Sequence, residues 1–219
     1  MPLTEATFTR RRFLGVAGAL SLAVALTACG KKAVIGRRVA AGATVLALGD
    51  SLTVGTGAPP ETSYPAVLAQ LSGWNVINAG VSGDTSAQAL ARLPALLQEH
   101  SPPLVLVAIG GNDFLRRLPE PQTRANVRQC CELALASGAQ VLLIAIPGFS
   151  ATAALTGALA DHPMFEEIAK SLKLPLHAKG WSPVLGNPGL RSDQIHGNAQ
   201  GYEHFARGLL GSAHAAQLI

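Results

Sequence analysis

The sequence has little of what marks several large classes of protein. Only 14% of its 219 residues are charged, and 48% are hydrophobic. This composition excludes an intrinsically disordered chain, since such chains combine low hydrophobicity with high charge. Three cysteines are too few for a small disulfide-stabilised domain. No segment repeats at a fixed period, which argues against a solenoid or a propeller. The length therefore favours one ordinary domain with its own apolar core.

The first 28 residues have the pattern of an export signal. A basic cluster, Arg10–Arg12, precedes an uncharged run over 13–28. That run is shorter than the roughly 20 residues that a bilayer-spanning helix needs. Its end, Leu26-Thr27-Ala28-Cys29, resembles a bacterial lipoprotein signal, in which the chain is cut before the Cys and a lipid is attached to it. The basic cluster also resembles a twin-arginine signal. A lone transmembrane anchor and a buried helix are the alternatives.

This interpretation divides the chain into a cleaved signal peptide over 1–28, a tether over 29–41 and one domain over 42–219. Cys29 would anchor the protein to a membrane, facing the periplasm, and Gly30 after it favours the outer membrane over the inner one. Removing the signal takes away three Arg and one Glu, which reduces the formal net charge from +4 to about +2. No run of Lys or Arg remains in the domain, so a nucleic-acid partner is not expected.

The domain alternates apolar runs with segments of helical periodicity. The apolar runs predict strands at Val45–Leu48, Val76–Asn78, Leu104–Ile109, Val141–Ile146 and Pro175–His177. Helices are predicted over Tyr64–Leu71, Thr85–Leu97, Thr123–Ala136, Phe165–Leu172 and Gly201–Leu210. Strands that are apolar throughout are typical of a parallel sheet covered on both faces. The pattern therefore predicts a three-layer α/β/α sandwich, flavodoxin-like, with a five-stranded parallel sheet.

Polar residues follow the first three predicted strands and gather again near the C-terminus. They are Gly49-Asp50-Ser51-Leu52, Asn78 to Asp84, Gly110-Gly111-Asn112-Asp113 and Asp193 to His196. Because ligands of open α/β sheets bind outside the carboxyl ends of the strands, we expect the chemistry of the protein there.

Three of these side chains suit nucleophilic catalysis. Ser51 directly follows a strand and begins a helix, but a serine hydroxyl is a weak nucleophile until a base takes its proton. His196 is the candidate base, since histidine titrates near neutral pH. Asp193, three residues earlier, is placed to hold the histidine tautomer and to stabilise the imidazolium. The Gly-x-Ser-x-Gly elbow of other serine hydrolases does not occur around this serine.

At these four blocks the chain resembles the SGNH (GDSL-type) hydrolase family, over residues 45 to about 205. Within that family it is most similar to the bacterial arylesterase and thioesterase/lysophospholipase subgroup. The resemblance implies that the Ser51 N–H, the Gly80 N–H and the Asn112 side-chain amide bind the oxyanion of the reaction. One departure is Gly197, which stands where many members have Pro after the catalytic His.

Plainer interpretations remain open for several of the neighbouring residues. Asp50 is explained by helix capping alone, and Asp84 and Asp113 by structural roles in loops. Cys130 and Cys131 are expected to be packing residues, because adjacent cysteines rarely bridge each other. No cluster has metal-ligand spacing and no phosphate-binding loop is present in the sequence. We therefore expect no metal and no cofactor.

The favoured function is hydrolysis of a small or lipid-like carboxylic ester or thioester through an acyl-enzyme. The segment over 148–161 contains no Arg or Lys, which favours an uncharged acyl or aryl group. A carbohydrate O-acetylesterase acting on envelope glycans would use the same triad, but sugar sites favour stacking aromatics and the chain has only two Trp and two Tyr. A non-catalytic envelope lipoprotein is the third hypothesis, which would predict damage to the triad.

Overall fold

The structure is a computed structural model that describes residues 1–2, 34–148 and 159–219. All elements named below belong to one compact unit, Ala33–Ile219. The predicted signal peptide over 1–28 and the predicted lipid-attachment residue Cys29 lie outside the described residues, as does most of the segment over 148–161.

The centre of the domain is a parallel sheet in the strand order β2-β1-β3-β4-β5. The strands are β1 (Thr44–Gly49), β2 (Asn75–Gly80), β3 (Leu104–Ala108), β4 (Gln140–Ile144) and β5 (Leu176–His177). In the register of β1 with β2, the last residues of the two strands, Gly49 and Gly80, lie opposite each other. Each predicted strand is present, and the predicted fold class is confirmed.

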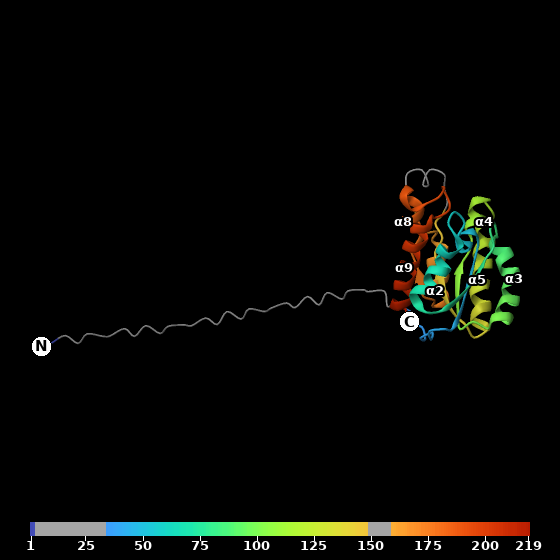
Figure 1. Cartoon of the computed structure of the whole chain (residues 1–219). Helices are drawn as coiled ribbons and strands as arrows, with labels where there is room; N and C mark the ends of the chain where they lie inside the picture. Colours follow the sequence, from blue (N-terminus) through green and yellow to red (C-terminus); the bar gives the residue numbers. More distant parts are fainter. Residues whose placement is uncertain (3–33, 149–158) are drawn as a thin grey trace. The chain divides into compact units, whose positions relative to one another are not determined.

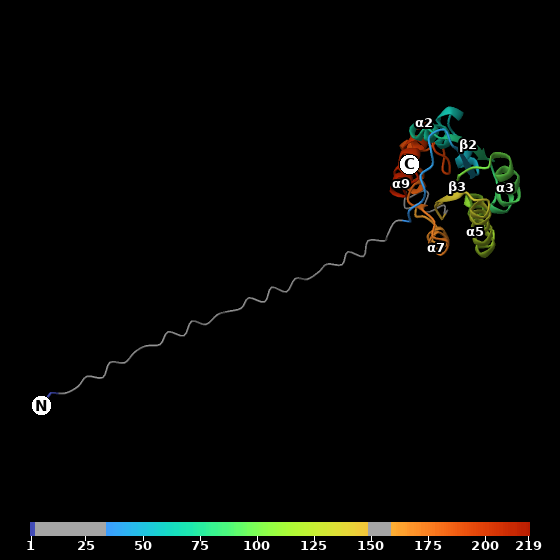
Figure 2. The same ribbon diagram turned by 90° about the horizontal axis from the view of Figure 1, so that it is seen from below.

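Helices cover both faces of the sheet. Helices α2 (Tyr64–Ser72) and α9 (Ala199–Ala215) pack together on one face, and α3 (Ser86–His100) and α5 (Glu120–Ala136) pack together on the other (Figures 1 and 2). The remaining helices and turns are α1 (Ser51–Val54), α4 (Gly111–Leu115), α7 (Met164–Leu172), α8 (Trp181–Gly186), η1 (Pro60–Thr62) and η2 (Pro188–Leu190). Helix α7 contacts α5, and α8 contacts α9. The result is the predicted α/β/α sandwich.

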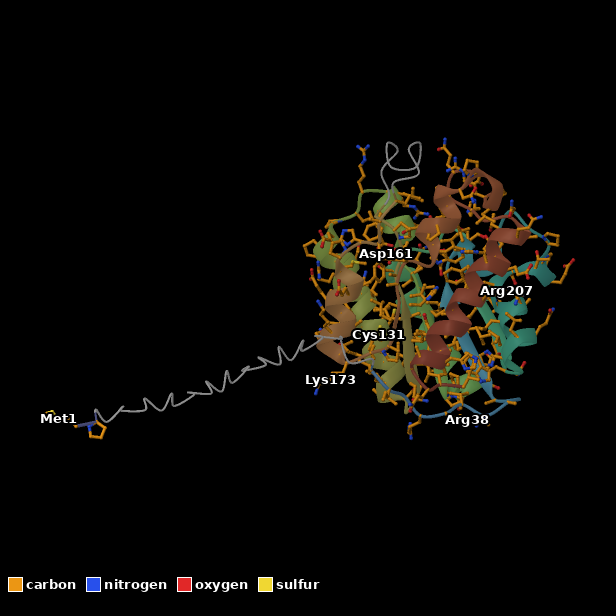
Figure 3. The ribbon with its side chains drawn as sticks, turned by 90° about the vertical axis from the view of Figure 1, so that its left-hand side faces the viewer. Met1, Arg38, Cys131, Asp161, Lys173 and Arg207 are labelled. Atoms are coloured by element: carbon orange, nitrogen blue, oxygen red, sulfur yellow. The ribbon has the colours of Figure 1, made fainter. Side chains whose placement is uncertain are left out.

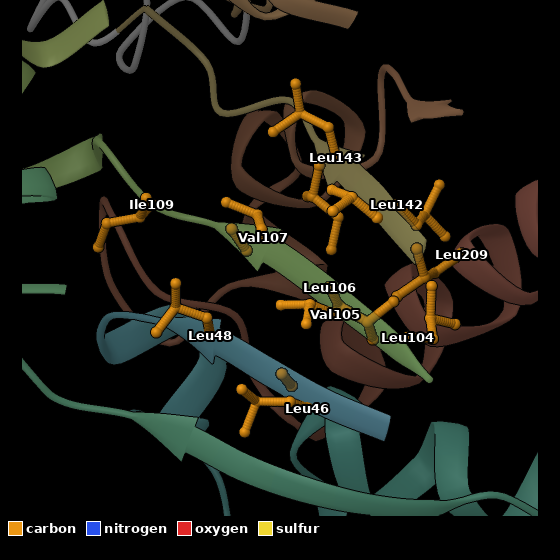
Figure 4. Packing of buried hydrophobic residues seen from close by; sticks show 14 of the residues in the cluster. Leu46, Leu48, Leu104, Val105, Leu106, Val107, Ile109, Leu142, Leu143 and Leu209 are labelled. Carbon is orange, nitrogen blue, oxygen red and sulfur yellow. The ribbon is translucent and has the colours of Figure 1, made fainter. Parts of the chain in front are cut away.

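Burial of the central strands explains why they are apolar throughout. Every residue of β3 is buried, as are all residues of β1 after Thr44. Figure 4 shows the leucines and valines of β1, β3 and β4 packed together, with Leu209 of α9 against them. Side chains of both strand faces are therefore buried, and each contributes roughly 1.5–3 kcal/mol to stability. The carboxyl ends of these strands are thereby fixed in space.

The segment before β1 is bound to the domain, although the predicted tether extends to residue 41. Gly36 N–H donates to the Ala216 carbonyl at 2.7 Å, and Val39 N–H donates to that of Leu218 at 2.8 Å. The Val39 carbonyl in turn accepts from Trp74 Nε1 at 3.2 Å. This part of the chain is bound to the domain because its backbone groups and an apolar side chain find partners there. Figure 3 shows Arg38 at the end of the domain opposite Asp161.

Among the described residues, no helix is both long enough and apolar enough to cross a bilayer.

An aromatic cluster fills the space between α2, α8 and α9. Trp181 stacks on Phe205 with 3.7 Å between ring centroids, and Tyr64 meets Phe205 edge-on at 4.9 Å. His177, at the end of β5, closes the cluster with only 5% of its surface exposed. His177 Nδ1 and Ser212 Oγ lie 2.8 Å apart, while His177 Nε2 has no partner among the described residues. Burial lowers the pKa of His177 to about 4, and the charge of Asp161 opposes this only weakly.

This burial predicts a loss of stability in mild acid. Between pH 6.5 and 4 the unfolded chain binds a proton at residue 177 that the folded protein does not bind, so the free energy of unfolding falls as the pH falls. Between pH 7 and 4.5 this group should account for about 2 kcal/mol of the decrease. Urea denaturation of the native protein and of His177→Gln at both pH values measures the difference.

The matched control is His204→Gln, because His204 is an exposed histidine of α9. Its decrease should equal that of the native protein. An equal decrease in His177→Gln would contradict the prediction.

Candidate active site

The position of Ser51 follows from the short step between β1 and α1. Asp50 caps the helix: its Oδ1 accepts from Leu52 N–H at 3.0 Å, and its carbonyl accepts from Thr53 and Val54 N–H, each at 3.0 Å. Ser51 is therefore the first residue of a helix, directly beyond a buried strand. Its N–H has no acceptor among the described residues. A serine hydroxyl with free N–H groups beside it is the arrangement that acyl transfer needs.

The structure brings the three predicted triad residues together. His196 Nε2 lies 3.0 Å from Ser51 Oγ, and His196 Nδ1 lies 2.8 Å from Asp193 Oδ2. The nucleophile and the base are 145 residues apart in sequence. Both separations are within hydrogen-bond range, so a proton can pass from the hydroxyl to the imidazole without movement of the backbone.

The loop that carries His196 is held by its own hydrogen bonds. Asp193 Oδ1 accepts from the N–H groups of Ile195 and His196, both at 2.8 Å. Ser192 N–H donates to the His196 carbonyl at 3.0 Å, and Ser192 Oγ donates to the Gly197 carbonyl at 3.2 Å. These bonds fix the imidazole although Gly197 replaces the expected proline.

The two carboxylates nearest the serine have opposite environments. Partial burial disfavours the charge of Asp193, but hydrogen bonds from the His196 ring and from the Ile195 N–H outweigh it, so the pKa of Asp193 lies below its ordinary value. Asp50 is only 2% exposed, and this burial raises its pKa to about 6 despite the hydrogen bond from Leu52. Asp193 is thus the ionised partner of the histidine, while Asp50 acts as the helix cap.

Asn112 approaches the serine from the end of β3. Its Nδ2 donates to the Asp84 carbonyl at 3.0 Å and lies 3.4 Å from Asp50 Oδ2. The second contact is long for a hydrogen bond. One amide hydrogen of Asn112 is therefore firmly bonded, and the other is held only weakly beside the nucleophile.

The structure corrects the prediction for Gly80. Its N–H donates to Asn78 Oδ1 at 3.0 Å and so is not free to bind an oxyanion. Gly80 has a different function, since a Cβ there would lie 2.4 Å from Val54 N and 2.8 Å from the Asp50 carbonyl oxygen. Only glycine allows β2 to approach the serine turn this closely.

Gly83, three residues further along, is the better candidate. It has a φ of 84°, which favours glycine, and its N–H has no acceptor among the described residues. The next residue is Asp84, whose carbonyl accepts from Asn112. The sequence contained a signal for it, because Ser82-Gly83-Asp84 is the typical composition of a tight turn.

The other polar residues of the four blocks have structural partners. Asp113 is buried and accepts from Ser86 N–H at 2.8 Å, Ser86 Oγ at 2.5 Å and Thr123 Oγ1 at 3.2 Å, so it joins α3 to α5. Cys130 and Cys131 are fully buried, and this burial raises the pKa of the Cys130 thiol to about 12. Both thiols are free and packed in the core.

A pocket of about 440 Å³, open solvent included, lies beside the serine. Its polar lining consists of Asp50, Ser51, Gly111 and Asn112, and the rest is apolar: Leu52, Leu115, Ile146, Pro147, Leu159, Leu185 and Ile195. The described residues that line it include no Lys and no Arg. The pocket thus combines the nucleophile and one amide donor with walls suited to an uncharged hydrocarbon group. In the part of the chain that the structure describes, no cluster of His, Cys, Asp or Glu could hold a metal ion.

Comparison with known proteins places this site in context. The profile of the GDSL-like Lipase/Acylhydrolase family matches residues 47–204. The thioesterase 1/protease 1/lysophospholipase L1 of Escherichia coli strain K12 is 39% identical over 164 residues, which cover 74% of this chain and 78% of that protein. An arylesterase of Vibrio mimicus is 41% identical over 107 residues, covering 47% of this chain and 54% of the relative.

Solved structures show the same similarity in three dimensions. A crystal structure of TesA matches with a TM-score of 0.68 and 31% identity, over 78% of this chain and 97% of the other. The psychrotrophic esterase EstA from Pseudoalteromonas, inhibited by monoethylphosphonate, matches with a TM-score of 0.67 and 27% identity, over 78% and 96% of the two chains.

Proposed function

This chain belongs to the GDSL-like lipase/acylhydrolase family and hydrolyses esters, and we propose that Ser51, His196 and Asp193 carry the reaction through an acyl-enzyme. The observation that supports this most strongly is the line of short contacts, 3.0 Å from Ser51 Oγ to His196 and 2.8 Å from His196 to Asp193. The esterase EstA shares the fold over 78% of this chain, the fold in which this line occurs.

In the first half-reaction, Ser51 Oγ attacks the ester carbonyl carbon. His196 Nε2 takes the hydroxyl proton, and Asp193 holds the Nδ1–H and stabilises the imidazolium. The carbonyl oxygen becomes an oxyanion, the imidazolium returns the proton to the leaving alcohol or thiol, and the acyl group remains on Ser51.

In the second half-reaction, His196 activates a water molecule that attacks the acyl-enzyme. The water proton passes to Nε2 and then to Ser51 Oγ as the acid leaves. Because the imidazole is fixed by the hydrogen bonds of its own loop, the same ring serves both halves of the reaction.

Three donors suit the oxyanion: the Ser51 N–H, the Gly83 N–H and Asn112 Nδ2. This assignment replaces Gly80, whose N–H is bonded to Asn78. The first two donors have no acceptor among the described residues, and Asn112 is held at one hydrogen by the Asp84 carbonyl. Rigid donors of this kind stabilise charge in the transition state without reorganisation.

The apolar pocket favours an acyl or aryl group without charge. Leu115, Ile146 and Leu185 line it together with other apolar side chains, and its described lining contains neither an aromatic ring nor a cation. A hydrocarbon chain gains free energy from this burial, whereas a sugar finds no aromatic face to stack on among the described lining residues. We therefore propose carboxylic esters and thioesters with an apolar acyl or aryl group as substrates, rather than acetylated glycans.

We propose that the protein works in the cell envelope as a lipoprotein anchored at Cys29, in the outer membrane and facing the periplasm. The support is the basic cluster, the uncharged run over 13–28 and the Leu26-Thr27-Ala28-Cys29 ending. This location is consistent with a lipid-like substrate, since such molecules reach an anchored enzyme easily.

The triad predicts the behaviour of two variants. Ser51→Ala should abolish hydrolysis of p-nitrophenyl butyrate, because no other hydroxyl or thiol is among the described residues that line the pocket. Asn112→Ala should lower kcat by about 10²–10³-fold, the usual cost of one oxyanion donor. Circular dichroism serves as the control for folding. Hydrolysis by Ser51→Ala at the native rate would contradict the proposed mechanism.

The pocket predicts an order of substrates. With p-nitrophenyl esters, kcat/KM should rise from acetate to medium-chain acyl groups by about tenfold or more, since each buried CH₂ contributes about 0.8 kcal/mol. Leu115→Asp should remove this rise while retaining activity on acetate, because Leu115 lines the pocket but is 37% exposed and its replacement buries no charge. A preference for acetylated glycans over all acyl esters would instead indicate the carbohydrate esterase.

The lipid anchor predicts the cellular fraction of the full-length chain. Expressed in a diderm bacterium, it should be found with membranes and incorporate a labelled fatty acid, whereas Cys29→Ala should do neither, because the acyl chains have no attachment point. Labelling of Cys29→Ala, or an unlabelled native protein, would contradict lipidation at this residue.

A further inference from the structure

Arg92 binds three segments of the chain that lie beside the proposed active site. It lies in α3, and its side chain is 25% exposed. Its Nε donates to Asp84 Oδ2 at 2.7 Å, Nη1 to the Ala79 carbonyl at 2.8 Å and Nη2 to the Gly49 carbonyl at 2.9 Å. One guanidinium thus joins the end of β1, the end of β2 and the loop after β2.

These three segments carry or support the proposed oxyanion donors. Gly49 is two residues before Ser51, and Ala79 precedes the glycine that packs against the serine turn. Asp84 follows Gly83, and its carbonyl holds Asn112 Nδ2 at 3.0 Å. The side chain of Asp84 binds Arg92 while its carbonyl binds Asn112, so the position of the amide donor depends on the guanidinium.

We infer that Arg92 is a positioning residue for the oxyanion site: by its three hydrogen bonds to Gly49, Ala79 and Asp84 it fixes the geometry of Ser51, Gly83 and Asn112. This inference rests on the proposed function. Arg92 does not line the pocket and therefore acts through Asp84 and the strand ends.

The chemistry explains why arginine is needed here. A guanidinium is planar and always charged, and it presents donors in a rigid fork. Three acceptors on three segments can be joined at once only by such a fork, whereas an ammonium group is a compact charge on a flexible stem. Asp84 is only 6% exposed, so its carboxylate also needs a charged partner.

Arg92→Lys tests this inference because it keeps the charge beside Asp84 and removes the fork. With p-nitrophenyl butyrate, kcat should fall by about 10- to 100-fold, somewhat less than for loss of a donor itself, while KM changes by less than about threefold. The matched control is Arg207→Lys, which alters an exposed arginine of α9 paired with Glu203 and should leave kcat unchanged (Figure 3).

A double-mutant cycle with Asn112→Ala separates positioning from general stability. Because one of the three donors that Arg92 positions is already absent, Arg92→Lys should reduce kcat by a clearly smaller factor in the Asn112→Ala background than in the native protein. The same fold-loss in both backgrounds, or a kcat of Arg92→Lys within twofold of native, would overturn the inference.

A second pair of substitutions keeps the inference testable if Arg92→Lys is unstable, and a separate result identifies failure of the proposed function. If Arg92→Lys does not fold, the pair Arg92→Gln/Asp84→Asn replaces it, since it leaves no unpaired buried charge, and the same cycle applies. If the proposed function itself were wrong, the native protein would not hydrolyse the ester, or Ser51→Ala would retain the activity. Neither result is expected if only the inference about Arg92 is wrong.

Discussion

The register between β1 and β2 is the constraint on which the active site depends. It places Gly49 opposite Gly80, so the turn that carries Ser51 and the loop that carries Gly83 leave the sheet side by side. Gly80 has no side chain, and a Cβ there would press on the backbone of Asp50 and Val54. The carboxyl ends of the buried strand β1 and of the edge strand β2 therefore lie in direct contact, and the active site forms at this end of the sheet.

The two aspartates near Ser51 differ in burial and in hydrogen-bond partners, and these differences shift their pKa values in opposite directions. Asp193 is about half exposed, its side chain being 54% accessible, and it is ionised because it accepts hydrogen bonds from the imidazole and from backbone N–H groups. Asp50 is adjacent to the nucleophile in sequence, but burial disfavours its charge, and its oxygens cap α1 and approach Asn112. Proximity in sequence is thus a poor guide to function here, whereas the hydrogen-bond partners identify which carboxylate supports the base.

Much of this protein was predictable from its sequence, for definite physical reasons. Strands such as Leu104–Ala108 are buried on both faces and are therefore apolar throughout, which periodicity detects. The triad was predictable because Ser51, Asp193 and His196 stand in distinctive local motifs. Folding then brings the loop between η2 and α9, which carries Asp193 and His196, against Ser51 at the end of β1.

Other features depend on contacts that no local pattern encodes. The family resemblance implies the Gly80 N–H as a donor, but the sequence does not reveal that this N–H is bonded to Asn78 Oδ1 while the Gly83 N–H has no acceptor among the described residues. Arg92 was missed because it lies within a helix, where an arginine is ordinarily a solvated residue. The sequence does not show that Gly36–Val39 binds to the domain, because the hydrogen-bond partners of this segment, Ala216 and Leu218, are at the other end of the chain.

The most direct test of this account is a crystal structure of the protein after reaction with a fluorophosphonate. We predict phosphorus bonded to Ser51 Oγ, His196 Nε2 within hydrogen-bond distance of the adduct, and the phosphoryl oxygen bound by Ser51 N–H, Gly83 N–H and Asn112 Nδ2. Modification of a different residue, or a phosphoryl oxygen directed away from these three donors, would contradict it.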